Sequence, residues 1–365
     1  MNNKLKSTFP VLLGAFAVAL TACSSATPTA PPAESPSAPA QSPSPSSSAV
    51  DLDALGIGNP NPPASLCDGR EKITVGYDVF SDTQDYVVSM NKSLNDVAQA
   101  VGGCVEFVIL VDNLDPATAV ANVKTFIQRE VDAVLLFQVV ASAQPGIMQL
   151  LNEAGIPAIA HAVPAPGAPF ISQSDSDVAK IAAESLVAAT KERFPGQTPW
   201  LLLGNEPQGG DTALHRVNDQ EPIIRAAFPE ITDDQVIFLD TNGKPDDAFT
   251  RTKNVIAKLP TDAPILTTGN NDDVVGAIYR ALDQGGLSNN TLAAGIGALF
   301  PSGVQNVCSY PAFVGTVDFA PDTLGNWLVP ALLAVTNGVE LPDITVPVSM
   351  LTKEQVPSRF PDFAC

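Results

Sequence analysis

From Glu71 onward, apolar runs of strand length alternate with segments whose apolar residues recur at helical spacing. This alternation is typical of chained β-α-β units, in which helices cover a parallel sheet. The runs are apolar throughout, as strands buried on both faces require. The expected strands are 72–79, 105–111, 132–137, 156–161, 200–203, 236–240, 264–267 and 292–296. The expected helices are 83–101, 116–130, 143–154, 177–194, one ending near 228, 247–259 and 272–284. The fold class predicted is α/β, with two doubly wound parallel sheets in tandem.

The first 22 residues have the form of an export signal. Lys4 and Lys6 precede an apolar run that begins at Val11 and is too short to span a bilayer. Residues 20–23, Leu-Thr-Ala-Cys, resemble the lipobox of bacterial lipoproteins. That resemblance implies a diacylglyceryl group on Cys23, and hence anchoring to the cell membrane by lipid. The alternative is an ordinary secretory signal in which Cys23 is incidental.

The segment after Cys23 has the composition of a tether. Residues 24–48 are almost wholly Ser, Pro, Ala and Thr, and a mixed segment with Leu52, Leu55 and Ile57 continues to about Pro63. Such a composition buries too little apolar surface to fold. Residues 23–63 are therefore predicted to be a disordered spacer between the membrane and the folded part.

The chain is strongly acidic. Its formal net charge of −20 becomes −22 when the signal, with its two lysines and no acidic residue, is removed. So acidic a surface argues against nucleic acid and against anionic lipid headgroups as partners.

Four cysteines follow the lipobox, namely Cys67, Cys104, Cys308 and Cys365. An even number in an exported chain indicates disulfides, and more than one pairing is open. We favour Cys67 with Cys104, because they flank the first two predicted strands at one sheet edge. Cys308 with Cys365 would then pin the C-terminal tail. No CxxC or His/Cys cluster has zinc spacing, so no metal site is expected.

Several segments together carry a family resemblance. They are KITVGYDVFSD, NVKTFIQREVDAVLLF, LLNEAGIPAIAHA, TTGNNDDVVGAIYRALDQGG and VGTVDFAPDTLGNWLVPALL, within residues 71–350. In order and spacing they resemble periplasmic type I solute-binding proteins of the ribose and galactose kind. The resemblance implies an N-terminal lobe at 71–174 and 320–346, a C-terminal lobe at 175–319 and 347–365, and a hinge. The ligand cleft is expected between the lobes, at the carboxyl ends of the strands.

The resemblance also implies ligand-binding positions, of which Asn270 matches best. Its amide both donates and accepts hydrogen bonds, as recognition of a hydroxyl requires. Asn271 and Asp272 are alternatives, and all three residues could instead cap the following helix. After the first and third strands, the candidates are Asp82, Gln84, Tyr86, Phe137 and Gln138. Asp82 could equally be a helix N-cap.

Other positions depart from the family pattern. His161 stands, with Ala162 and Val163, where sugar binders carry an Asp-Arg pair, and it is either a ligand group or a structural histidine. Gly297 and Phe319 replace a usual Asp and Gln. In the C-terminal lobe the candidates are Asp211, His215 and Arg216. These departures favour a bulkier or less polar ligand, with Phe137, Phe300 and Phe319 as an apolar wall.

The sequence predicts a solute-binding lipoprotein that delivers a small ligand, with carbohydrate favoured, to the permease of an ABC importer. It is expected to be a monomer. The alternatives are a receptor of the same fold that signals to a membrane sensor, or a binder of a non-sugar solute. No nucleophile elbow, Walker lysine or dinucleotide fingerprint follows the strands, so we expect no enzyme activity and no cofactor.

Overall fold

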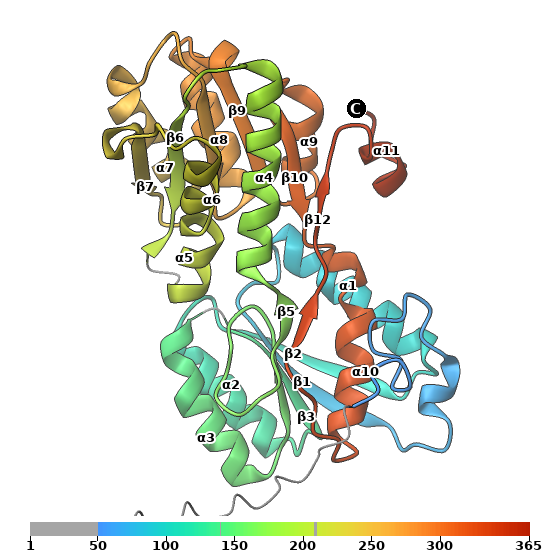
Figure 1. The fold of residues 1–365 in the computed structure, drawn as a ribbon. Coiled ribbons are helices and arrows are strands. Elements are labelled where there is room, and N and C mark those ends of the chain that lie inside the picture. Colours follow the sequence, from blue (N-terminus) through green and yellow to red (C-terminus); the bar gives the residue numbers. More distant parts are fainter. Residues whose placement is uncertain (1–49, 139, 208–209) are drawn as a thin grey trace, which may run out of the picture. The chain divides into compact units, whose positions relative to one another are not determined.

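The computed structural model describes residues 50–365 except 139, 208 and 209. The expected signal, the lipidation site Cys23 and most of the expected tether lie outside the described residues. The α/β architecture with two doubly wound parallel sheets is confirmed (Figure 1). We call the parts built on these sheets lobe one and lobe two.

Lobe one contains a parallel sheet with the strand order β2-β1-β3-β4. Its strands are β1 (Ile73–Val79), β2 (Val105–Val111), β3 (Ala133–Phe137) and β4 (Ala158–Ala160). Its helices are α1 (Asp85–Ala100), α2 (Pro116–Gln128), α3 (Gln144–Ala154) and α10 (Gly325–Val335). Alternate residues of β3 face two different cores: Leu135 packs with α1 and α10, and Leu136 packs with α2 and α3. Both faces of the sheet are therefore covered, which explains the continuously apolar strands.

Lobe two contains a sheet with the strand order β12-β10-β9-β8-β6-β7. Its parallel strands are β6 (Trp200–Asn205), β7 (Val236–Asp240), β8 (Ile265–Gly269), β9 (Thr291–Gly297) and β10 (Phe313–Asp318). The edge strand β12 (Ser349–Leu351) pairs antiparallel to β10.

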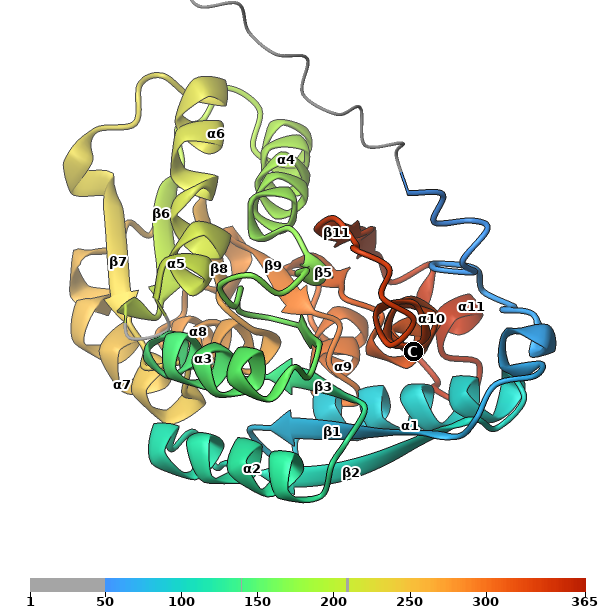
Figure 2. The ribbon, with the colours of Figure 1, turned by 90° about the horizontal axis from the view of Figure 1, so that it is seen from below.

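The helices of lobe two lie on both faces of its sheet. On one face are α4 (Asp175–Arg193), α5 (Gly210–Asn218) and α6 (Gln220–Ala227). On the other are α7 (Pro245–Val255), α8 (Asp272–Gln284) and α9 (Ser302–Ser309). Figure 2 shows α6 on one side of β6, and α7 and α8 on the other. A short helix, α11 (Val356–Arg359), follows β12.

A small sheet marks where the chain passes between the lobes. β5 (Ile171–Gln173) pairs in parallel with β11 (Ile344–Val346). The chain enters lobe two after β5, returns to lobe one after β10, and joins lobe two again after β11 (Figure 1). These crossings place the carboxyl-end loops of the two large sheets around a common space.

Residues 50–63 differ from the expected tether. Ile57 is only 3% exposed and lies in the core of lobe one, with Leu52 and Leu55 packed against it. The Gly58 N–H donates to the Asn326 carbonyl at 2.9 Å. Gly58 has φ +80°, and a Cβ there would lie 2.7 Å from the Trp327 ring. The expectation that the tether extends to Pro63 is wrong, because these apolar side chains pack in the lobe-one core that includes residues of α10.

The two disulfides in the described part of the chain are the pairs that we favoured from the sequence. Cys67 pairs with Cys104 and Cys308 pairs with Cys365, at Cα–Cα distances of 5.6 and 4.9 Å. The first ties the segment before β1 to the start of β2, and the second ties the C-terminus to α9.

Candidate functional site

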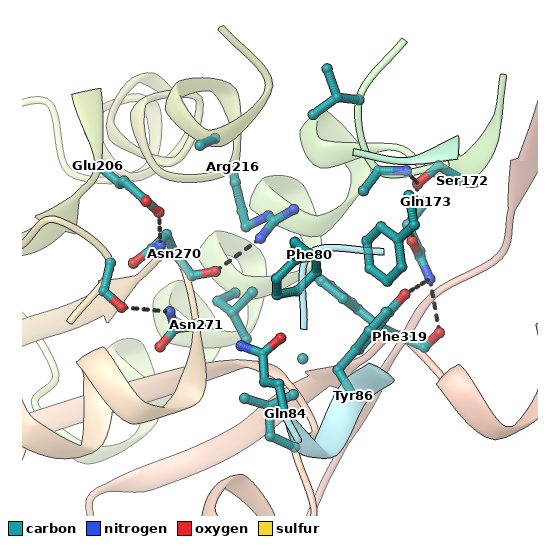
Figure 3. Close-up of a pocket in the computed structure, with 18 of the residues that line it drawn as sticks. Phe80, Gln84, Tyr86, Ser172, Gln173, Glu206, Arg216, Asn270, Asn271 and Phe319 are labelled. Carbon is teal, nitrogen blue, oxygen red and sulfur yellow. Dashed lines mark hydrogen bonds between the residues drawn. The ribbon is translucent and has the colours of Figure 1, made fainter. Parts of the chain in front are cut away.

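A cavity of about 360 Å³ lies between the loops of the two lobes. This volume is within the range of small-molecule sites. Seven of the predicted ligand residues line it: Gln84, Tyr86, Phe137, Arg216, Asn270, the alternative Asn271, and Phe319. Figure 3 shows how several of them converge from both lobes.

Asn270, Asn271 and Asp272 have different roles in the structure. Asn271 is the N-cap of α8, since its Oδ1 accepts from the Val274 N–H at 2.9 Å. Asp272 is buried, and its carboxylate accepts from the Thr316 hydroxyl at 2.7 Å and the Leu299 N–H at 2.8 Å. Asn270 remains at the cavity, where its amide N–H donates to Glu206 (Figure 3). Of the three candidates, Asn270 and Asn271 line the cavity and Asp272 supports the loop behind it.

Charged groups of both signs line the lobe-two side. Arg216 donates through Nε to Asp175 at 2.6 Å and through Nη1 to the Asn270 carbonyl at 3.0 Å. Burial raises the pKa of Glu206, while the nearby Arg216 and the Asn270 amide oppose that shift. Arg216 therefore orients the backbone of Asn270, and Asn270 in turn orients Glu206.

Several aromatic rings that line the cavity pack against one another. Tyr86 from α1 lies 5.7 Å from Phe137 and 6.4 Å from Phe319 between ring centroids. The Arg216 guanidinium lies over the Phe319 ring, 5.0 Å from its centroid. One face of the Phe319 ring is thus covered by the Arg216 guanidinium, and Tyr86 from lobe one meets this ring edge-to-face.

His161 is a structural residue in this fold. Its Nδ1 lies 2.7 Å from the Ile171 carbonyl, which can only accept, so Nδ1 carries the proton. Its Nε2 therefore accepts from the Tyr86 hydroxyl at 3.2 Å. Burial lowers the pKa of His161 to about 4, which keeps the ring neutral. Gln173 completes the network by donating to Tyr86 and to the Phe319 carbonyl (Figure 3).

Three other predicted ligand residues, Asp82, Gln138 and His215, do not line the cavity. Asp82 is exposed in the turn before α1, whose N-cap is Gln84 rather than Asp82. Gln138 is fully buried and donates to Asp112 at 2.5 Å. His215 is exposed and lies 3.1 Å from Asp219. The side chain of Asp211 lies outside the described residues.

Phe300 also departs from its predicted place. It is 45% exposed and packs against Phe360 and Phe363, at centroid distances of 5.3 and 5.5 Å. It belongs to the C-terminal end of lobe two rather than to the cavity wall, because the turn after β9 directs it toward α11.

Sequence reasoning missed several residues that line the cavity: Phe80, Leu114, Ser172, Gln173, Glu206, Asn242 and Lys244. Glu206 directly follows β6, so its position at a strand's carboxyl end was a usable signal. Ser172 and Gln173 lie in β5, a strand too short to be read from periodicity.

A family model described as "Periplasmic binding protein domain" matches residues 75–340, and the chain belongs to this family. The family is one of substrate-binding proteins. No curated protein sequence matches the chain. Within the part that the structure describes, none of the helices combines the length and apolar character needed to cross a membrane.

Solved structures with the same fold include a myo-inositol-binding protein from Caulobacter bound to myo-inositol. It has a TM-score of 0.67 and 18% identity, over 80% of this chain and 97% of that chain. An ABC transporter solute-binding protein from Actinobacillus succinogenes with bound D-allose has a TM-score of 0.65 and 17% identity, over 79% and 100%. One from Agrobacterium vitis bound with α-D-tagatopyranose has a TM-score of 0.64 and 21% identity, over 79% and 99%.

Proposed function

We propose that this protein is an extracytoplasmic solute-binding lipoprotein that captures a carbohydrate or polyol between its lobes and delivers it to an ABC importer. One observation carries the proposal. Asn270 is only 4% exposed, and its Oδ1 has no hydrogen-bond partner within the described part of the chain. A buried amide oxygen at a cavity wall is costly unless a ligand donor satisfies it.

The neighbours of Asn270 fit a hydroxylated ligand. Glu206 can accept from a hydroxyl, and Arg216 can donate to a hydroxyl or ring oxygen. The rings of Tyr86 and Phe319 can pack against the C–H faces of a sugar ring. Binding in this account is recognition without chemistry, which agrees with the family of substrate-binding proteins.

Capture requires that both lobes touch one molecule. The cavity is lined by Gln84 and Tyr86 from lobe one and by Arg216 and Asn270 from lobe two. A ligand held by both walls would favour the closed arrangement of the lobes about the crossings after β5, β10 and β11. Membership of the periplasmic binding protein family supports delivery to a permease. The resemblance of residues 20–23 to a lipobox supports anchoring through Cys23.

Binding to a defined panel tests the proposal. The full-length protein is titrated calorimetrically with D-allose, D-galactose, D-tagatose, myo-inositol and glycerol. We expect saturable binding of at least one sugar or cyclic polyol, and a loss of roughly 5- to 100-fold in Asn270→Ala, whose partner hydroxyl loses its hydrogen bond.

The matched control is Asn289→Ala, because Asn289 is exposed and lies outside the cavity. It should bind as the wild type does. No binding to any member of the panel, or equal affinity in Asn270→Ala and the wild type, would contradict the proposal.

A further inference from the structure

The lobe-one wall of the cavity is less polar than the residues at the strand ends of this lobe suggest. Asp112, Gln138 and His161 stand at or just after strand ends, yet each is fully buried. Gln138 donates to Asp112, and His161 bonds to Ile171 and Tyr86. The Tyr86 hydroxyl is thereby also engaged within the protein. These polar groups stabilise the loops and are not available to a ligand.

Apolar side chains occupy the wall in their place. Phe80, Leu114, Phe137 and Val163 all line the cavity. Phe80 packs edge-on against Phe137, with 5.0 Å between ring centroids. A second, more open hollow is lined by Phe80, Ser81, Gln84, Asn113 and Leu114, so it shares residues with the main cavity. This hollow therefore borders the main cavity at Phe80, Gln84 and Leu114.

Leu114 is held in an unusual conformation. It is 55% exposed, although large apolar side chains are usually buried. Asn113 and Leu114 have φ values of 55° and 63°, in the left-handed region that leucine rarely adopts. The buried Asp112 carboxylate accepts from the Leu114 N–H at 2.6 Å and so stabilises this turn. A strained backbone that exposes a leucine beside a cavity indicates a functional constraint.

The opposite wall contrasts with this one. Lobe two presents Glu206, Arg216 and Asn270, which suit a polar ring. Resting on the proposed function, we propose that Phe80 and Leu114 form an apolar subsite for a non-polar substituent of the carbohydrate, such as the aglycone of a glycoside. Leu114 is then a specificity-determining residue, since its side chain bounds both the cavity and the hollow.

Matched sugars and glycosides test this inference. The full-length protein is titrated with D-glucose, D-galactose and D-allose, and with the phenyl β-glycoside of each. We expect at least one phenyl glycoside to bind roughly 10-fold or more tightly than its parent sugar, because binding would remove the apolar surface of the phenyl group from contact with water. In Leu114→Asn that preference should fall to within about 3-fold. Asparagine tolerates the left-handed conformation, so the turn should persist.

Val88→Gln is the control, because Val88 is 49% exposed on α1 and lies outside both hollows. It should keep the wild-type preference. If phenyl glycosides bind no more tightly than their parent sugars, or if Leu114→Asn keeps the preference, the subsite is refuted while the proposed function stands. If neither these sugars nor their glycosides bind, the subsite is refuted, and the proposed function also fails only if no member of the earlier panel binds.

Discussion

A buried pair of carboxyl groups in lobe one should make stability depend on pH. Asp78, in β1, is fully buried and accepts at Oδ1 from Asn122 at 2.8 Å. Its Oδ2 accepts no hydrogen bond within the described part of the chain. Burial raises the pKa of Asp78 to about 7, Asn122 opposes this shift, and the nearby Asp112 adds to it. Burial also raises the pKa of Asp112, and Asp115 adds to that increase.

The direction and size of the effect follow from linkage. The carboxyl has an ordinary pKa of 3.8, so between about pH 4 and pH 7 the folded state binds more protons than the unfolded state. The free energy of unfolding therefore falls as pH rises through this window. The stabilisation that protonation of Asp78 gives the folded state is fully present only below about pH 4. With ~1.4 kcal/mol per pKa unit, the loss by pH 8 is on the order of 4 kcal/mol.

Asp78→Asn removes this titration while keeping an oxygen that can accept from Asn122. Thermal unfolding at pH 5 and pH 8, followed by circular dichroism, measures the effect. We expect the variant to gain melting temperature relative to the wild type on going from pH 5 to pH 8, by roughly 5–10 °C. Asp82→Asn, at an exposed carboxyl of the same lobe, should track the wild type. Parallel pH profiles for the wild type and Asp78→Asn would refute the reasoning.

The remaining predictions concern packing and anchoring. Gly303→Ala should lower stability by about 1–3 kcal/mol, because a Cβ there would lie 2.2 Å from the Asp272 carboxylate. Gly146→Ala, in α3 with open space around its Cβ, should instead be neutral or stabilising, and chemical denaturation of both variants checks this contrast. Cys23→Ala should leave the protein unprocessed or released from the membrane fraction of cells. Unchanged fractionation and mass in that variant would refute the lipobox interpretation.

Elements with a strong periodic signal could be predicted from the sequence, whereas short ones could not. The strand expected at 105–111 agrees with β2 (Val105–Val111), because a long apolar run between turns has few alternatives. β5, β11 and β12 each span three residues, which is too few to show a period. The packing of Ile57 was missed because composition indicates an average tendency and does not identify a partner surface.

The candidate site was predicted in location but only partly in membership. Strand ends indicate which loops meet. The family resemblance then indicated Asn270 and Tyr86 among the residues of these loops, and both line the cavity. It cannot tell which way a polar side chain turns. Gln138 turns inward to Asp112, and His161 bonds to the Ile171 carbonyl, because tertiary partners that are distant in sequence satisfy them.

A crystal structure with the panel compound that binds most tightly tests the central claim most directly. The account predicts that the compound lies between the lobes, with a hydroxyl within hydrogen-bond distance of Asn270 Oδ1 and its ring against Tyr86 or Phe319. A compound bound elsewhere, or touching one lobe only, would contradict capture in the cleft between the lobes.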